Sequence, residues 1–193
     1  MKVLMINGSR RESGCTYTAL NIIADVLKKN GIESEIYFIG DKVLNGNIND
    51  TVNTAAEKMK EADALIVGSP VYYASPSGEV IAFLDRFWAA AGKDLRRKPA
   101  ASVTSARRAG TTATLDVINK YFMFSEMPII SSNYWNMVHG NNPDEVLKDE
   151  EGVQIMKTIG NNMSWILKCI EAGKNNGVNE PETVEKVFTN FIS

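Results

Sequence analysis

Residues 8–16, here called the first loop, combine residue types that bind anions. The loop contains two glycines and three hydroxyl side chains: Gly8, Gly14, Ser9, Ser13 and Thr16. It joins a short apolar run to a segment with helical spacing, so it opens onto the start of a helix. Unpaired backbone N–H groups and the positive end of the helix dipole favour an anion there, and hydroxyls add donors to phosphate oxygens. The pattern therefore predicts a phosphate cradle.

The first loop differs from the two best-known phosphate motifs. Its glycines are six residues apart, which excludes Gly-x-Gly-x-x-Gly, and no Lys-Ser/Thr follows Gly14, which excludes a Walker A loop. An ordinary strand–helix turn with Thr16 as the N-cap is the alternative. Arg10 and Arg11 either neutralise the phosphate or are solvated, and the sequence leaves both options open.

Residues 68–76, the second loop, combine stiffness with flat aromatic side chains. Two prolines limit the backbone, and Gly68 allows it to approach a ligand closely. Tyr72 and Tyr73 offer faces that can stack on an aromatic ring. The alternative is that both tyrosines are amphipathic residues at the edge of the core. Because the first loop is expected on the same edge of the sheet, we interpret the second loop as a ring-binding segment.

Residues 105–112, the third loop, contain Ser105, a glycine and the pair Arg107 and Arg108. The arginines can stabilise negative charge on a ligand or grip a nucleotide phosphate. The alternative is a surface loop with Thr111 or Thr112 as a helix N-cap.

A fourth segment, residues 133–140, places Tyr134 and Trp135 in a loop. These aromatic residues predict a lid over the ligand, a contact with a second subunit or a hydrophobic plug beneath the last helix. His139, the one histidine of the chain, is interpreted as a hydrogen-bonded loop residue rather than a catalytic acid.

Apolar runs and helical patterns alternate along the chain and set the position of these loops. The runs are residues 3–6, 36–39, 64–67, 101–104 and one that begins at Pro128, and the helical segments are residues 16–30, 52–62, 79–91, 112–124 and 150–172. Such alternation predicts an α/β protein with a three-layer, doubly wound, five-stranded parallel sheet. The three loops then lie at the carboxyl ends of the strands, where such folds bind ligands. Residues 1–193 are expected to form one domain, with a C-terminal extension from about residue 174 that includes a short helix at residues 181–191.

Composition excludes several classes of protein. The chain has 193 residues with 21 Lys+Arg against 23 Asp+Glu, a net charge of −2, which gives no sign of a nucleic-acid partner. No apolar run approaches the roughly 18 residues of a membrane span. Cys15 and Cys169 are expected to be free thiols in a cytoplasmic protein, and with one histidine they predict no zinc or iron–sulfur site.

These four segments together resemble the NADPH-dependent FMN reductase family, a group of flavodoxin-like flavoproteins. The resemblance begins with Ile-Asn-Gly-Ser-x-Arg in the first loop, where Arg10 and Cys15 replace the proline and asparagine usual in the family. It continues through Gly-Ser-Pro-Val-Tyr-Tyr in the second loop, the third loop and Tyr-Trp-Asn at residues 134–136, and covers about residues 1–170. Some relatives carry an iron–sulfur cysteine cluster after the second strand. Here that stretch, residues 43–49, has no cysteine, so we expect electrons to pass through flavin only.

The resemblance implies a flavodoxin-like sheet with strand order 2-1-3-4-5 and non-covalently bound FMN. The residues expected to bind FMN are Ser9, Arg11, Ser13, Cys15, Thr16, Pro70, Val71, Tyr72, Tyr73, Ser105, Ala106, Arg107, Arg108 and Gly110. It also implies a homodimer or homotetramer, for which Tyr134 and Trp135 are the candidate interface.

The expected reaction takes hydride from NADPH or NADH to flavin N5 and passes electrons to a small-molecule acceptor. A quinone, an azo or nitro compound, or free flavin are the acceptor classes, and the sequence does not choose among them. No catalytic side chain is assigned, because the flavin carries the chemistry. The alternative function is a non-enzymatic, flavodoxin-type electron carrier. Such carriers are usually strongly acidic, so the net charge of −2 favours the enzyme.

Overall fold

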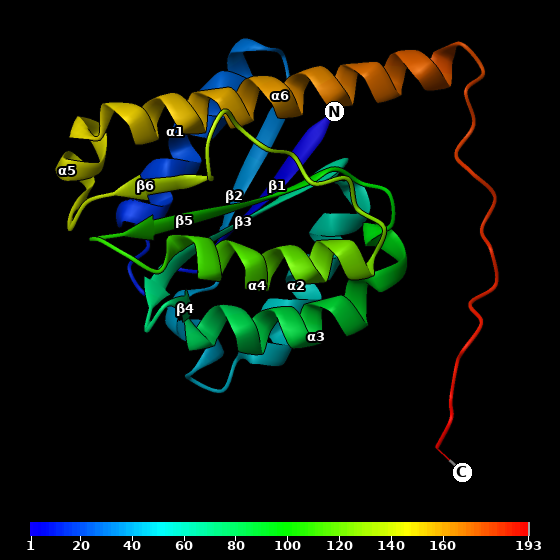
Figure 1. Cartoon of the computed structure of the whole chain (residues 1–193), viewed down its shortest axis with the longest axis horizontal. Helices are drawn as coiled ribbons and strands as arrows, with labels where there is room; N and C mark the ends of the chain where they lie inside the picture. Colours follow the sequence, from blue (N-terminus) through cyan, green and yellow to red (C-terminus); the bar gives the residue numbers. More distant parts are fainter. Residues whose placement is uncertain (193) are drawn as a thin grey trace.

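A parallel sheet forms the centre of the molecule in the computed structural model, which describes residues 1–192 (Figure 1). Its strands are β1 (Lys2–Asn7), β2 (Glu33–Phe38), β3 (Ala64–Tyr72), β5 (Ala100–Ala106) and β6 (Met137–His139). They lie in the order β2-β1-β3-β5-β6 with every pair parallel, and the short β4 (Ser75–Pro76) pairs antiparallel with the end of β3. Since β5 and β6 are the fourth and fifth parallel strands, this is the predicted order.

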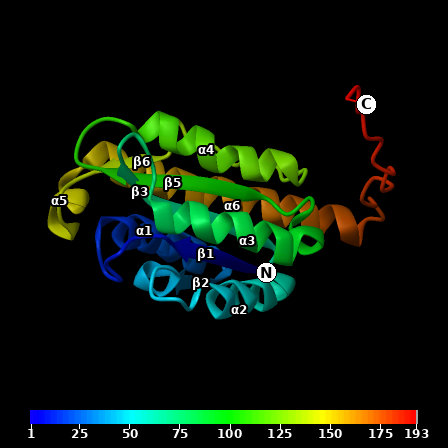
Figure 2. The ribbon, with the colours of Figure 1, turned by 90° about the horizontal axis from the view of Figure 1, so that it is seen from below.

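Two layers of helices cover the sheet, as Figure 1 and Figure 2 show. One face carries α1 (Cys15–Lys29), α5 (Pro143–Lys148) and α6 (Glu150–Asn175), and the other carries α2 (Ile48–Glu61), α3 (Gly78–Leu95) and α4 (Thr111–Phe124). The strand β1 shows why both faces need cover. Leu4 and Ile6 face the α3 side while Val3 and Met5 face the α1 side, all fully buried. The three-layer α/β prediction is confirmed.

The predicted fifth strand is displaced along the chain. Ile129 makes only an isolated parallel bridge to Ala100, and the ladder with β5 resumes at residues 137–139. Between them, the buried Asn136 donates to the carbonyl of Ile130 and accepts from the hydroxyl of Ser132. These bonds close a compact turn that interrupts the strand. The apolar run that begins at residue 128 is too short to predict which residues pair with β5.

The predicted helix at residues 181–191 is wrong, because residues 176–192 contain neither helix nor strand. Its apolar side chains are exposed, and a helix this short is unstable without a surface to cover its apolar face. Three short elements were not expected from the sequence: the 3-10 helix η1 (Gly40–Val43), β4 and α5.

Close packing at the carboxyl ends of β1 and β3 brings the loops together. The amide of Gly8 donates to the carbonyl of Gly68 at 2.9 Å, and a side-chain carbon at Gly8 would overlap Val80 of α3. Gly68 in turn lies against Thr16 and Leu20 of α1. These two glycines therefore let both helices approach the strand ends. Within residues 1–192, none of the helices has the length and hydropathy that a membrane crossing requires.

Candidate functional site

A cleft of about 520 Å³ lies at the carboxyl ends of β1, β3 and β5. This volume is within the range of roughly 300–1,000 Å³ for small-molecule sites. Ten of the predicted residues line it: Ser9, Arg11, Cys15, Thr16, Pro70, Val71, Tyr72, Ser105, Ala106 and Arg107. The structure thus brings the three loops onto one cavity.

Four predicted residues do not line this cleft: Ser13, Tyr73, Arg108 and Gly110. Four other residues do: Arg10, Gly14, Gly140 and Asn141. The sequence analysis left undecided whether Arg10 contacts the ligand, and it placed Gly14 in the first loop without assigning it to the site. Gly140 and Asn141 follow β6, so the displaced fifth strand hid their place at the same edge.

The buried side chain of Asn7 braces the first loop from the end of β1. Its Nδ2 donates to the carbonyl of Glu12 at 2.8 Å, and its Oδ1 accepts from the amide of Ser9 at 3.2 Å. The Ser9 hydroxyl then accepts from the amide of Arg11 at 3.1 Å. These bonds hold the loop as a curved strap. Asn7 was missed as a site residue, although a polar residue that ends a buried strand is a signal for such a role.

The start of α1 offers unpaired donors to the cleft. Gly14 is its N-cap, no side chain caps it, and no acidic residue lies in its first turn. The amides of Cys15, Thr16 and Tyr17 have no acceptor among residues 1–192. Amides in this state favour an anionic ligand, as the predicted cradle requires.

Thr16 has a different partner from the one expected of an N-cap. Its hydroxyl bonds to the hydroxyl of Ser105 at 2.8 Å, and both side chains are buried. The alternative reading of Thr16 as the cap of α1 is therefore wrong. This bond ties the first loop to the third loop across the floor of the cleft.

The two arginines of the first loop have different surroundings. Arg10 Nε lies 3.2 Å from the carboxylate of Glu79, a residue of α3 that is only 5% exposed. Arg11 makes no ion pair with any residue in the described part of the chain, 1–192. Arg10 thus anchors the loop on α3, while the guanidinium of Arg11 is available to an anion in the cleft.

Cys15 lies at the first position of α1, and its Sγ is 3.6 Å from the carbonyl of Gly140. Burial raises the pKa of this thiol above its usual value of 9.0, although Arg11 opposes the shift. The thiol is therefore neutral at pH 7 and acts in the cleft as a small, weakly polar group.

The second loop forms a hairpin whose tip is strained. Tyr73 and Ala74 occupy the left-handed region, with φ of 52° and 56°, a conformation that favours glycine. Tyr72 reaches the cleft and is 42% exposed, whereas Tyr73 projects fully into solvent. Of the two tyrosines, only Tyr72 is placed to contact a ligand in the cleft.

Gly110 supports this hairpin from the third loop. It has φ of 95° and is the N-cap of α4, so neither Thr111 nor Thr112 has that role. A side-chain carbon there would lie 2.8 Å from Ala74 Cα and 2.9 Å from Val71 Cγ1. Gly110 thus positions the cleft wall without lining it.

His139 stabilises the end of β6. Its Nε2 bonds to the carbonyl of Arg108 at 3.0 Å, and its backbone amide donates to Asp149 at 2.6 Å. The residue is hydrogen-bonded as expected and does not line the cleft. Tyr134 and Trp135 also lie outside the cleft, with their rings packed edge to face at 4.5 Å.

Comparisons with known proteins agree on the class of protein that has this architecture. A family model described as NADPH-dependent FMN reductase matches residues 1–142. An iron–sulfur flavoprotein of Methanocaldococcus jannaschii is 29% identical, with 89% of this chain and 100% of that protein covered. An iron–sulfur flavoprotein of Methanosarcina thermophila is 23% identical, with 90% and 99% covered.

Solved structures give the same fold. A flavone reductase superposes with a TM-score of 0.69 at 20% identity, covering 89% of this chain and 64% of that one. FerB, a flavoenzyme NAD(P)H:acceptor oxidoreductase of Paracoccus denitrificans, gives 0.65 at 15% identity, covering 86% and 97%. These likenesses establish the flavodoxin-like arrangement of sheet and helices.

The residues of this chain do not fit the iron–sulfur cluster for which the relatives are named. Such clusters are held by four cysteine thiolates, and this chain has two cysteines. One is in the cleft loop and the other, Cys169, is exposed on α6. The FMN implied by the family is different, because the unpaired α1 amides, the hydroxyls and Arg11 match the donors that a phosphate needs.

Proposed function

The chain belongs to the NADPH-dependent FMN reductase family, and we propose that it binds FMN in the cleft and transfers electrons from NAD(P)H to a small-molecule acceptor. The observation that carries the proposal is the free α1 N-terminus within a cleft built from three loops at one edge of the sheet. Such an edge is where doubly wound folds bind nucleotides and flavins.

The phosphate of FMN is assigned to the first loop. The amides of Cys15 and Thr16 and the hydroxyl of Ser9 supply neutral donors, and Arg11 supplies a positive charge. The Asn7 brace and the Arg10–Glu79 pair keep these donors in place before the ligand arrives. Little conformational entropy is then lost on binding.

The flat ring of FMN is assigned to the space between the second and third loops. Pro70, Val71 and Tyr72 form one wall, and Ser105 to Arg107 form the other. Tyr72 presents an aromatic face, and the backbone of both loops presents N–H and C=O groups to a polar ring edge. Arg107 provides positive charge beside a ring that becomes negative on reduction.

FMN, when bound, supplies the hydride and electron transfer, and the protein supplies binding, orientation and electrostatics. The protonated Cys15 thiol is not a nucleophile at neutral pH. The half-exposed Tyr72 leaves one side of the cleft open to a nicotinamide or an acceptor. No side chain of the cleft is assigned a proton-transfer role.

A non-enzymatic electron carrier is the second candidate. Carriers dock on basic partners through strongly acidic surfaces, whereas this chain has a net charge of −2 and arginines at 10, 11 and 107 on the cleft. That distribution favours small anionic ligands such as NADPH over a basic protein.

Steady-state oxidation of NADPH, with added FMN and a quinone, separates the two candidates. We expect turnover that depends on both FMN and the quinone. Binding of FMN without NADPH oxidation above the rate of free FMN would instead support the carrier. Substitution of quinone by a nitro compound, an azo dye or free FMN then ranks the acceptor classes.

A further inference from the structure

The C-terminal arm, residues 176–192, leaves the end of α6 as an extended segment. It runs away from the body of the molecule in both ribbon views (Figure 1 and Figure 2), and every residue in it is exposed. The flavin cleft lies at the opposite edge of the sheet, so the arm has no part in the function proposed above.

The root of the arm is fixed to the body by two arginines from the turn between α3 and β5. Arg96 Nη1 donates to the hydroxyl of Thr183 at 2.9 Å, and Arg97 Nη2 donates to the carbonyl of Glu182 at 3.3 Å. Both guanidinium side chains are largely buried, with exposures of 29% and 19%.

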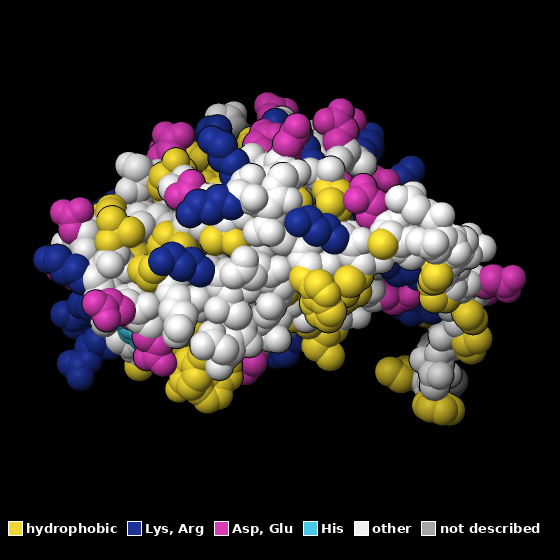
Figure 3. Space-filling view, turned by 90° about the horizontal axis from the view of Figure 1, so that it is seen from above, with side chains coloured by type: hydrophobic (Ala, Val, Ile, Leu, Met, Phe, Trp, Pro, Cys, Tyr) yellow, Lys and Arg dark blue, Asp and Glu magenta, His cyan; other side chains and the backbone are white. Residues whose placement is uncertain are grey.

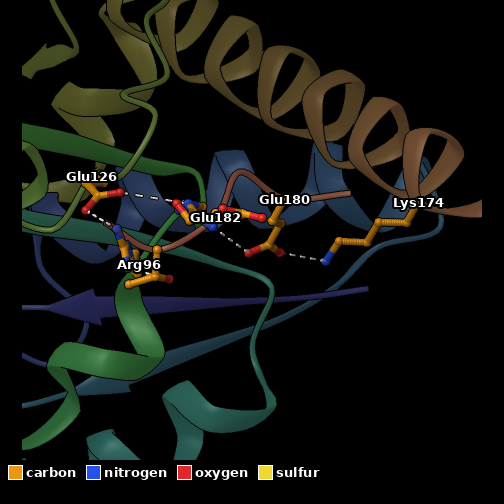
Figure 4. A network of polar contacts seen from close by, with 7 residues as sticks. Arg96, Glu126, Lys174, Glu180 and Glu182 are labelled. Carbon is orange, nitrogen blue, oxygen red and sulfur yellow. Dashed lines mark hydrogen bonds and ion pairs between the residues drawn. The ribbon is translucent and has the colours of Figure 1, made fainter. Parts of the chain in front are cut away.

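An ion-pair network strengthens this root, as Figure 4 shows. Glu180 pairs with Arg97 at 3.6 Å and with Lys174 of α6 at 3.4 Å. Glu126 holds Arg96 from the far side at 2.6 Å. These hydrogen bonds and ion pairs fix the arm to the body as far as Thr183, so they set the point from which residues 184–192 extend.

Beyond Thr183 the arm carries apolar side chains that nothing covers. They are between 79% and 95% exposed: Val184, Val187, Phe188, Phe191 and Ile192. Counted from Val184 they stand at positions i, i+3, i+4, i+7 and i+8, which is the pattern of one face of a helix. A helix of nine residues is unstable alone in water, so its apolar face needs a second surface.

A matching surface lies on the α6 side of the sheet, whereas the arm beyond Thr183 lies by the end of α4 on the other side. Trp165 on the outer side of α6 is 66% exposed, and Tyr134 and Trp135 are 52% and 54% exposed. Asn162 of α6 donates to the carbonyl of Ser131 at 2.8 Å, which fixes the Tyr134–Trp135 loop against the helix. We call these three residues the aromatic face. Figure 3, which looks onto the α6 side, shows hydrophobic side chains gathered there and on the arm.

The arm does not lie on the aromatic face of its own chain. Beyond Thr183 it lies by the end of α4, where the Nζ of Lys186 is 5.0 Å from the ring of Phe124. Since α4 and α6 cover opposite faces of the sheet, this contact directs the arm away from α6.

We propose that residues 184–192 form an amphipathic helix that docks on the aromatic face of a second copy of this chain. The exchange buries Phe188, Phe191 and Trp165 on each copy. At about 150–250 Å² for each fully buried aromatic side chain, and with exposures of 79%, 95% and 66%, the six rings alone bury roughly 700–1,200 Å², which approaches the area of a stable interface before the aliphatic residues are counted. Charges also match, because Glu185 flanks the apolar face of the arm and the exposed Lys168 follows Trp165 by three residues.

Sedimentation velocity on the full-length chain and its variants at micromolar concentration tests this proposal. The wild-type chain is expected to sediment as a dimer or larger species. Phe188→Glu in the arm and Trp165→Glu on the aromatic face should each raise the dissociation constant at least tenfold. Leu147→Glu on α5 is the matched control, since Leu147 is an exposed leucine (58%) outside both surfaces.

Mixing the two defective variants distinguishes exchange between copies from a contact within one chain. A Phe188→Glu copy keeps an intact aromatic face and a Trp165→Glu copy keeps an intact arm, so the mixture should associate more strongly than either variant alone. Near-ultraviolet circular dichroism confirms that each variant is folded. A monomeric wild type, unchanged association in both variants, or a mixture no heavier than its components would each overturn the proposal.

Discussion

Gly110→Ala tests how the second and third loops are joined. The structure assigns two separate costs to this substitution. A left-handed φ of 95° costs a residue with a Cβ about 1–2 kcal/mol, and the added carbon would press on Ala74 Cα at 2.8 Å and Val71 Cγ1 at 2.9 Å. Forcing an extra carbon into a packed contact costs roughly 1–3 kcal/mol more. The sum is a loss of about 2–5 kcal/mol in the free energy of unfolding.

Gly31→Ala is the matched control, because Gly31 has a similar φ of 77° but no atom within 4 Å of its added carbon. It should lose only the conformational cost of about 1–2 kcal/mol. Urea denaturation of both variants gives the two free energies, and fluorescence titration gives FMN affinity. Gly110→Ala should also weaken FMN binding by at least tenfold, since Val71 and Tyr72 move with the hairpin. Equal destabilisation of the two variants would refute the close approach of the loops.

Three further predictions follow from the site and its surroundings. Arg11→Gln should weaken FMN binding about tenfold or more with unchanged stability, because a charge-assisted hydrogen bond to phosphate contributes about 1.5–3 kcal/mol. Arg10→Gln should instead lower the free energy of unfolding by about 1 kcal/mol, because it removes the ion pair with Glu79. The same loss of FMN affinity in both variants would contradict this division of roles. Thr16→Val leaves the buried hydroxyl of Ser105 without its partner, so it should lower the free energy of unfolding in urea by about 1–3 kcal/mol. The control Thr18→Val removes a bond to a backbone carbonyl on the more exposed side of α1 and should cost less. The reverse order would contradict the assigned role of the Thr16–Ser105 bond. The hydrogen bond from Lys58, followed by the one from Lys2, holds the pKa of Glu35 below its usual value. This carboxylate therefore stabilises the fold above about pH 4.3 and loses that effect as the pH falls through its folded pKa. The difference in unfolding free energy between wild type and Glu35→Gln, under about 1 kcal/mol, should vanish in acid, and a difference that grows in acid would contradict the sign.

Strong periodic patterns predicted most of the fold. The apolar run at residues 3–6 is buried on both sides, and a run of that kind has few alternatives to a central parallel strand. The helix predicted at residues 150–172 is α6, which extends only to Asn175. Its apolar residues keep their spacing over six turns, so the period is unambiguous.

The predictions of the fifth strand and of the C-terminal helix were wrong for different reasons. At residues 128–130 the apolar run is real, but Asn136 and Ser132 build a turn that shifts the strand to residues 137–139. Such side-chain bonds are invisible to hydrophobic periodicity. In the arm the period is real as well, but none of the residues 1–192 covers its apolar side chains, and so short a helix is unstable without such cover.

The candidate site was predicted at the level of loops and less well at the level of single residues. Parallel topology alone places three loops at one edge, and residues such as Ser105 and Tyr72 follow from that. Both arginines line the cleft, but only Arg10 is paired, and its partner Glu79 is 69 positions further along the chain. The exposure of Tyr73 depends on a turn with positive φ at Tyr73 and Ala74, and the sequence does not predict it because neither position is a glycine or an asparagine.

The visible absorption spectrum of the purified protein tests the central claim most directly. The protein is loaded with FMN, desalted, and then mixed with NADPH in the absence of oxygen. The account predicts flavin bands that persist through desalting and bleach on addition of NADPH. Protein that retains no flavin, and that does not quench FMN fluorescence in a titration, would contradict the assignment of the cleft.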